Sequence, residues 1–344
     1  MRRAALLTIS ILIVVTMVPG VQAQTTPTLD QRVADLEARV VVLESRLGIV
    51  PSPTPSPSPT TSPSPSSSPT PSTTPSPTPS PGAYPPPSTE TTSTNFRLRC
   101  AFSHRAHVDP IVAPGPTGTL SAHVHDFFGN RSTASDSTYA SMTAAGTTCT
   151  RAADTAGYWV PTLVAPDGTH VKPAELTVYY RNRPAGYGTV MPFPADFRMI
   201  AGNPTVASSP VAYWTCENES DTSLATRKTH IPNCGTSRIV THVFFPTCWD
   251  GVHVDVADHR SHMVYAANAQ SGAITNISNV AVCPPSHPVK LPQIDLRVAY
   301  PVRDGTGYRF ADGQLLPHAD FWNTWQQGAL VTLVHDCLHL GQSC

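Results

Sequence analysis

Residues 175–181 read ELTVYYR, and residues 294–300 read IDLRVAY. Polar and apolar side chains alternate in both stretches, and β-branched and aromatic residues are frequent. Successive side chains of a β-strand point to opposite faces, so this alternation predicts strands with one buried face. Similar runs occur at residues 238–245 (RIVTHVFF), 262–266 (HMVYA) and 329–335 (ALVTLVH).

Proline, glycine, asparagine and aspartate separate these runs, and no stretch after residue 95 shows convincing helical periodicity over three turns. We therefore expect residues 95–344 to form a mainly β globular head. A sandwich or jelly-roll-like core with long, disulfide-tied loops fits the spacing of the runs. The length suits one sizeable domain or two small ones.

The chain has 8 cysteines, all at or after residue 100. An even number in an exported chain indicates disulfides, although eight cysteines allow 105 different pairings. Proximity in the sequence favours Cys216–Cys234, Cys248–Cys283 and Cys337–Cys344, which leaves Cys100 with Cys149. No two cysteines form a C-x-x-C pair, which argues against a zinc ribbon.

The first 23 residues have the pattern of a secretory signal peptide. Arg2 and Arg3 precede an apolar run at 4–18, and Val21–Ala23 offers a small-residue cleavage site. The run is shorter than the roughly 20 residues of a membrane-spanning helix. We expect a secreted, extracellular protein with no transmembrane segment in the mature chain; an uncleaved anchor is the alternative.

Residues 28–49 carry a heptad pattern that predicts a short parallel coiled coil. The apolar positions are Leu29, Val33, Leu36, Val40, Leu43 and Leu47. Arginine and glutamate flank this seam in a twice-repeated pattern that resembles a trimerisation motif, whereas valine at a and leucine at d otherwise favour two strands. We expect a homo-oligomer, a trimer or alternatively a dimer; an amphipathic helix packed on the head remains open.

Residues 50–94 are almost wholly proline, serine and threonine. Such a segment has nothing to bury, so we expect a disordered, extended linker between the coiled coil and the head. A spacer of this kind suits both a surface-presented protein and a secreted enzyme, so it does not decide the function.

Charge and motifs exclude several function classes. The formal net charge is −1 and charged residues make up 13% of the chain, which argues against a nucleic-acid partner. There is no G-x-S-x-G, phosphate loop or dinucleotide fingerprint. The head has only three glutamates, Glu175, Glu217 and Glu219, so paired-carboxylate chemistry would depend on aspartate.

Histidine is the unusual residue: there are 14, all after residue 100. Three stretches combine histidine with aspartate, namely 121–130 (SAHVHDFFGN), 253–263 (HVDVADHRSHM) and 318–323 (HADFWN). Histidines two apart in a strand face the same side and can hold a metal together, and histidines three apart lie on one side of a helical turn.

These stretches supply the candidate site residues. The catalytic candidates are His123, His125, Asp126, His259, His262, His318 and Asp320. The metal-ligand candidates are His123, His125, His259 and His262. They would hold one divalent metal, whose bound water serves as a nucleophile, or act as general acid and base. The alternative is that the histidines are buried, hydrogen-bonded structural residues.

Several strings resemble a known family, among them HVDPIVAPG (107–115), SAHVHDFFGN, YWVPTL (158–163), FPTCWDG (245–251) and HADFWNTW (318–325). From about residue 100 to 325 the chain resembles the secreted family catalogued as domain of unknown function nineteen ninety-six. The resemblance implies an exported protein, sometimes joined to carbohydrate-binding or adhesive modules, with no established reaction. Ala122 and Thr324 stand where the family pattern has glycine.

Together these features predict a secreted protein whose β-rich head carries a site lined by histidine and aspartate. We expect it to act on, or bind, an extracellular or cell-wall polysaccharide, with assistance from a metal. The alternative is a non-catalytic adhesion or glycan-binding module with structural histidines. Metal sequestration is a third, weaker hypothesis.

Overall fold

The computed structural model describes residues 94–183, 189–203, 210–219, 224–268 and 281–344. The signal peptide, the coiled coil at 28–49 and all but the last residue of the linker at 50–94 lie outside these ranges. The described residues fold mainly as antiparallel β-structure, which confirms the mainly β head.

The strands are β1 (Asn95–Cys100), β2 (Phe102–Ala106), β3 (His125–Gly129), β4 (Gly157–Pro161), β5 (Leu163–Val164), β6 (Glu175–Arg181), β7 (Arg198–Ala201), β8 (Ala212–Cys216), β9 (Ile239–Phe244), β10 (Cys248–Trp249), β11 (Met263–Val264), β12 (Ala267–Asn268), β13 (Ala281–Val282), β14 (Val289–Lys290), β15 (Gln293–Tyr300), β16 (Arg309–Phe310) and β17 (Ala319–Trp322). The helical segments are α2 (Tyr139–Thr143), the 3₁₀ turn η1 (Leu224–Thr226), α3 (Gln327–Leu333) and the π-helical η2 (Val334–His339).

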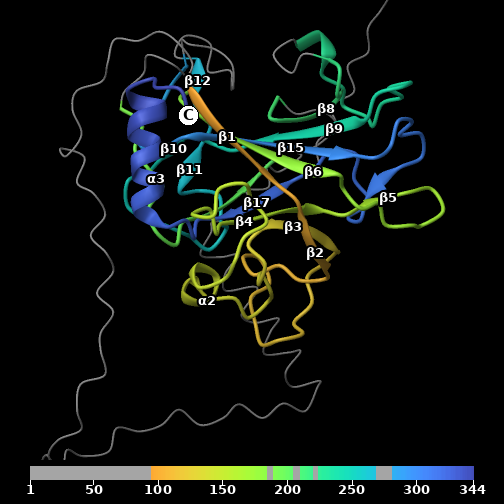
Figure 1. The fold of residues 1–344 in the computed structure, drawn as a ribbon, viewed down its shortest axis with the longest axis horizontal. Helices are drawn as coiled ribbons and strands as arrows, with labels where there is room; N and C mark the ends of the chain where they lie inside the picture. Colours follow the sequence, from red (N-terminus) through yellow and green to blue (C-terminus); the bar gives the residue numbers. More distant parts are fainter. Residues whose placement is uncertain (1–93, 184–188, 204–209, 220–223, 269–280) are drawn as a thin grey trace, which may run out of the picture. The chain divides into compact units, whose positions relative to one another are not determined.

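Two five-stranded antiparallel sheets dominate the fold (Figure 1). Sheet A has the order β1-β6-β15-β9-β8, and sheet B has the order β2-β3-β4-β17-β7. The predicted strands at 175–181, 238–245 and 294–300 are the three central strands of sheet A. The chain passes directly from one sheet to the other, because only Ala101 separates β1 from β2.

One hydrophobic core lies between the two sheets. Sheet A contributes Leu98, Val178 and Leu296, and sheet B contributes Phe128 and Phe321. A hydrogen bond of 2.7 Å between the hydroxyls of two buried tyrosines, Tyr158 and Tyr180, also joins the sheets. Each sheet therefore has an inner face toward this core and an outer face away from it.

The outer face of sheet B has a second, smaller core. Phe127, Trp159 and Trp322 point outward from β3, β4 and β17 and pack under residues of the segment between β2 and β3 and of α2, including Ile111 and Met142. This cover takes the outer face of sheet B out of solvent. At β1 and β6 the outer face of sheet A carries exposed polar and charged side chains, as β1 shows by its strict alternation of exposed and buried residues. At β8 and β9 this face is buried by a small cluster of Val211, Tyr213 and Phe244.

All four disulfides match the pairing favoured by sequence proximity. They join Cys100 to Cys149, Cys216 to Cys234, Cys248 to Cys283, and Cys337 to Cys344. No free cysteine is present. Disulfide pairing of every cysteine is typical of proteins that fold in an oxidising compartment.

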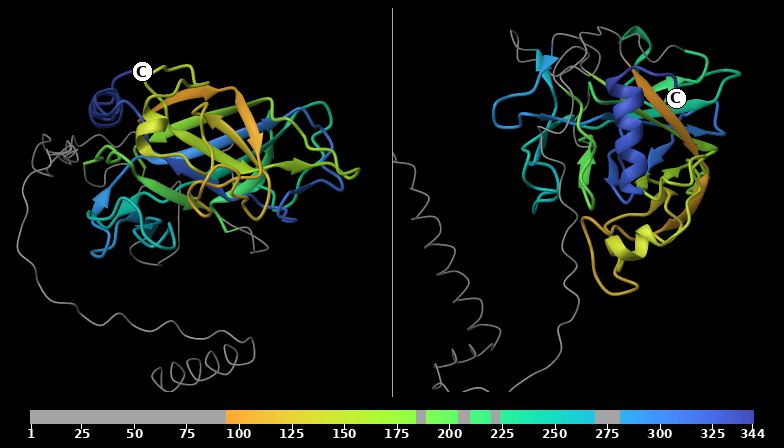
Figure 2. Two further views of the ribbon diagram at one scale, coloured as in Figure 1. Left: turned by 90° about the horizontal axis from the view of Figure 1, so that it is seen from below. Right: turned by 60° about the vertical axis from the view of Figure 1, so that its left-hand side comes forward.

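The strand predicted at 329–335 is wrong, because this stretch belongs to the helical segment α3–η2. Leu330, Val334, Cys337 and Leu338 are buried at the spacing of one helix face, and they pack on the core between the sheets. The helical segment lies beside the start of β1 (Figure 2), where the Thr94 hydroxyl donates to the Leu338 carbonyl. Within the described residues, no helix is both long and apolar enough to span a membrane.

Candidate metal centre

Three histidines from two separate stretches meet at the outer face of sheet B. His123 lies two residues before β3, His125 begins β3, and His318 immediately precedes β17. The ring centroids of His123 and His125 are 4.4 Å apart, and those of His123 and His318 are 5.1 Å apart. The rings of His125 and His318 are 5.8 Å apart. The structure thus brings the H-x-H pair together with the third histidine.

The strand register explains this meeting. Strand β4 lies between β3 and β17, with Pro161 opposite His125 and Trp159 opposite Asp320. Extending the antiparallel register by two residues places His318 opposite Pro161 as well. His125 and His318 therefore flank the same residue of β4, although 193 residues of sequence (318 − 125) separate them.

Buried nitrogens of all three histidines have no hydrogen-bond partner among the described residues, namely Nε2 of His123, Nε2 of His125 and Nδ1 of His318. Nδ1 of His318 lies 3.6 Å from an Asp312 oxygen, and its Nε2 lies 3.9 Å from an Asp320 oxygen. Nδ1 of His125 lies 2.9 Å from the Val108 carbonyl, which can only accept, so Nδ1 carries the proton and Nε2 keeps its lone pair. Such a second hydrogen bond is how proteins orient metal-binding histidines.

Two buried carboxylates lie next to the histidines. Asp320 is fully buried, and neither of its oxygens has a hydrogen-bond partner among the described residues. An Asp109 oxygen lies 3.8 Å from Nε2 of His125, while its other oxygen accepts from the backbone amides of Ile111 and Val112. Ligand atoms of His123, His125 and His318 lie within 4.8 Å of one another, as do those of Asp109, His125 and Asp320.

Burial sets the charge states of these groups. Desolvation lowers the pKa of His125 well below its usual value, and repulsion from His123 and His318 lowers it further. Desolvation raises the pKa of Asp320 well above its usual value, and the nearby Asp109 adds to the increase. Neutral imidazole is the form that binds a metal. A bound cation would also add positive charge beside the two buried carboxylates, in addition to the nearby Arg260.

The group lines an open cavity of about 210 Å³. Arg260 contributes to its wall, and its guanidinium donates to the carbonyls of Gly202 (2.8 Å) and Ile200 (3.3 Å). Gly202 has φ +78°, and a Cβ there would lie 2.7 Å from the Pro317 carbonyl. Glycine thus lets the end of β7 approach the residue before His318, which keeps Arg260 close to the histidines.

Asp126 is not part of this group, because it points to the opposite face of β3. Its carboxylate lies in the inner layer, where it accepts from Arg105 Nε (2.6 Å), Arg105 Nη2 (3.2 Å) and the Thr162 hydroxyl (2.9 Å). The period of two that puts His123 and His125 on one side puts Asp126 on the other. The ion pair of Asp126 with Arg105 is a structural contact between the neighbouring strands β3 and β2 of sheet B.

The structure also places His259 and His262 outside the group. His259 Nδ1 is 2.7 Å from Asp255, and His262 Nε2 is 2.8 Å from the carbonyl of Arg198. The His262 ring packs on Phe197. These contacts fit the alternative interpretation of structural histidines. His259 has φ +53°, a backbone conformation unusual for a residue other than glycine, and it immediately precedes Arg260.

Sequence reasoning missed three residues of the site. Asp109, Arg260 and Asp312 belong to it; the last has an oxygen 3.6 Å from His318 Nδ1. Asp109 precedes a proline and holds its own turn, so its sequence signal is that of an ordinary loop aspartate. Arg260 lies between His259 and His262, and no motif in the sequence distinguishes it from an ordinary loop arginine.

The comparisons with known proteins give one match. A family model described as a domain of unknown function (DUF1996) covers residues 109–325. This range includes all three histidines and both buried carboxylates. No curated protein and no solved structure matches the chain significantly.

Proposed function

This chain belongs to the DUF1996 family, and from that premise we propose that its head holds one divalent metal ion through His123, His125 and His318. The observation that carries the proposal is the convergence of three histidines, two of which, His123 and His125, have a buried Nε2 with no hydrogen-bond partner within the described residues. Native proteins rarely leave such atoms unsatisfied, and each costs roughly 1–3 kcal/mol. A metal ion satisfies all of them at once.

The donor set favours a transition metal such as Zn²⁺. Imidazole binds zinc, copper, iron and nickel well, whereas magnesium and calcium prefer sites built from oxygen. Three protein ligands and an open cavity are the arrangement of catalytic zinc sites, in which the bound water becomes acidic near neutral pH. Asp320 and Asp109 are the carboxyl groups beside the histidines, and with a bound cation they would be the residues able to accept a proton.

The proposed substrate is an extracellular or cell-wall polysaccharide. The export signal expected at residues 1–23, the proline-rich linker and the four disulfides support a secreted protein. Arg260 on the cavity wall offers a cation to a sugar hydroxyl or carboxylate. The proposed reaction is metal-assisted cleavage of the polysaccharide.

A non-catalytic adhesion module is the second candidate function. The hydrogen bonds of His259 and His262 favour it, because these two histidines hold loops in place. The same argument does not extend to His123 and His125, whose facing nitrogens have no such partner within the described residues.

The test is elemental analysis of the full chain, secreted with its disulfides formed and never exposed to a nickel column. We expect about one metal ion per chain, its loss in the double variant His123→Ala/His125→Ala, and its retention in His253→Ala. His253 is an exposed histidine paired with Asp250 and serves as the matched control. Release of reducing ends from polysaccharides is then measured with and without the metal.

Metal that persists in the double variant would overturn the proposed ligands. A metal-free protein that binds no added Zn²⁺, Cu²⁺ or Mn²⁺ would overturn the metal centre itself. If the protein holds one metal ion per chain but releases no reducing ends, the proposed metal site is supported and the proposed polysaccharide cleavage is overturned.

A further inference from the structure

The outer face of sheet A carries a group of arginines that the metal centre does not use. Arg97 and Arg99 point outward from β1, while Phe96 and Leu98 point into the core. Arg297 points outward from β15 on the same side. Because both sheets turn their inner faces to one core, this face and the metal centre lie on opposite outer faces of the two sheets.

The register of three neighbouring strands arranges the arginines in rows. Thr177 of β6 is opposite Arg99 of β1 on one side and opposite Arg297 of β15 on the other. In the next row, Tyr179 is opposite Arg97. Neighbouring strands are about 4.8 Å apart, so Arg99 and Arg297 stand roughly 10 Å apart at the backbone, with the Thr177 hydroxyl between them.

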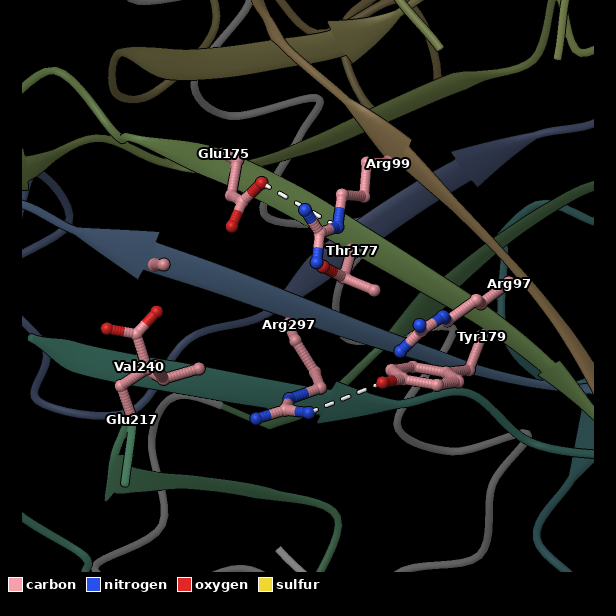
Figure 3. Close-up of a pocket in the computed structure, with 9 residues that line it drawn as sticks. Arg97, Arg99, Glu175, Thr177, Tyr179, Glu217, Val240 and Arg297 are labelled. Atoms are coloured by element: carbon pink, nitrogen blue, oxygen red, sulfur yellow. Dashed lines mark hydrogen bonds and ion pairs between the residues drawn. The ribbon is translucent and has the colours of Figure 1, made fainter. Parts of the chain in front are cut away.

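Figure 3 shows these side chains around a shallow cavity of about 200 Å³. The arginines rise on both sides of Thr177 and Tyr179, which form the floor. The Tyr179 hydroxyl accepts a long hydrogen bond of 3.5 Å from Arg297, and the Arg181 guanidinium lies 4.2 Å from the centre of the Tyr179 ring. The floor therefore offers hydroxyl groups, and the walls offer guanidinium groups.

Among the described residues, each carboxylate of this face contacts at least one arginine. Arg238 pairs with both Glu175 and Glu217. Asp295 accepts a hydrogen bond of 2.9 Å from Arg181. Arg99 is 4.0 Å from Glu175 across a largely exposed gap, which is a weak contact.

The described lining of the cavity therefore has excess positive charge. Three arginines (97, 99 and 297) face two carboxylates (175 and 217), a surplus of one charge. The whole chain has a formal net charge of −1, so this surplus is a local feature. All three cations that line the cavity are arginines, whose planar fork binds carboxylates through two parallel hydrogen bonds.

We propose that this arginine face binds an acidic polysaccharide through the carboxylates of its uronic acid units. The carboxylates pair with Arg97, Arg99 and Arg297, and sugar hydroxyls bond to Thr177 and Tyr179. A single-stranded nucleic acid would need exposed aromatic rings for its bases, and one side of the Tyr179 ring is covered by Arg181. The face would anchor the glycan on the side of the head opposite to the metal centre.

The experiment measures binding of sodium polygalacturonate to the full chain by calorimetry at 50 and 300 mM NaCl. We expect the double variant Arg97→Glu/Arg99→Glu to weaken binding at least tenfold, and higher salt to weaken binding to the wild-type protein. Arg309→Glu, which reverses an exposed arginine on β16 outside both large sheets, is the matched control and should bind like the wild type. Arg297→Lys keeps the charge but loses the planar guanidinium fork, so its affinity for polygalacturonate should lie between those of the wild type and the double variant.

Three results would overturn the proposal: no binding of polygalacturonate by the wild-type protein, equal weakening in Arg309→Glu, and equally tight binding of polyphosphate or single-stranded DNA. Arg97 and Arg99 are exposed, so the double variant should fold, and its melting temperature verifies that. The inference shares only its class of ligand with the proposed function. Unchanged metal content in the arginine variants separates a failure here from a failure of the metal centre.

Discussion

The charged groups on the outer faces of the two sheets differ in their exposure to water. On sheet A, Arg99 and Glu175 stand at the surface, where water solvates each charge and a 4.0 Å contact suffices. On sheet B, Asp320 and His125 are buried beneath the segment between β2 and β3, and atoms of both lack hydrogen-bond partners within the described residues. A polar group that is exposed is solvated by water, whereas a buried one without a hydrogen-bond partner is costly, and a bound cation is one way to satisfy it.

The space between the sheets is a third environment, in which a buried charge should have the largest effect. Asp154 is fully buried and accepts hydrogen bonds from the Tyr158 hydroxyl and the Ala156 amide. Tyr158 in turn contacts Tyr180, which accepts from Trp325 Nε1. Burial raises the pKa of Asp154 to about 8.

We therefore predict that the stability of the head falls as pH rises, and that Asp154→Asn removes much of this dependence. The folded state binds the Asp154 proton more tightly than the unfolded state, so the stabilisation is complete below about pH 4 and is lost as pH rises toward 8. The expected slope is at most about 1.4 kcal/mol per pH unit. Urea unfolding at pH 5, 6.5 and 8 measures it.

The control for this prediction is Asp136→Asn, because Asp136 is exposed and its substitution should leave the slope unchanged. A variant Asp154→Asn with the same slope as the wild type would assign the pH dependence to other groups.

Asp320 tests the buried face of sheet B directly. In EDTA, Asp320→Asn should raise the free energy of unfolding by about 1–2 kcal/mol, because it removes a carboxylate buried without a partner. With saturating Zn²⁺ the wild type should become more stable than Asp320→Asn, since metal binding raises the free energy of unfolding more in the wild type than in the variant. Melting curves with EDTA and with Zn²⁺ check both signs. A lower stability in EDTA would mean that Asp320 has a partner in solution.

The smallest effect is expected on sheet A. Arg99→Ala should change the free energy of unfolding by less than about 0.5 kcal/mol, because a largely exposed ion pair contributes little. The same substitution should still weaken polygalacturonate binding, which separates stability from binding at this residue. A loss above about 1 kcal/mol would show that Arg99 supports the fold.

Local patterns predicted much of the fold. Alternation and the frequency of β-branched and aromatic residues identified β6, β9 and β15, although only β6 alternates in burial, while β9 and β15 are buried on both faces. Proximity gave the disulfides, since each cysteine pairs with the next cysteine along the chain. The α3–η2 segment was missed because its valine and threonine residues favour strands. It forms a helix because the helical spacing places Leu330 and Val334 together in the core.

The site was predicted in part for the same reason. The H-x-H spacing brought His123 and His125 together although only His125 lies in β3, and the strand turns Asp126 to the opposite face. The approach of His318 depends on the order of β3, β4 and β17, which no local pattern contains. Asp109 and Arg260 come from loops whose positions only the folded chain determines.

The passage of the chain from β1 to β2 has a mechanical consequence. Strand β1 is an edge strand of sheet A and is the first strand after the proline-rich segment. A pulling force transmitted through that segment would peel β1 away from β6, one residue pair at a time, beginning at Asn95. Peeling must stop at Cys100, which the disulfide ties to Cys149. Arg97 and Arg99 would detach from sheet A together with β1, while β2 and the rest of sheet B would stay folded.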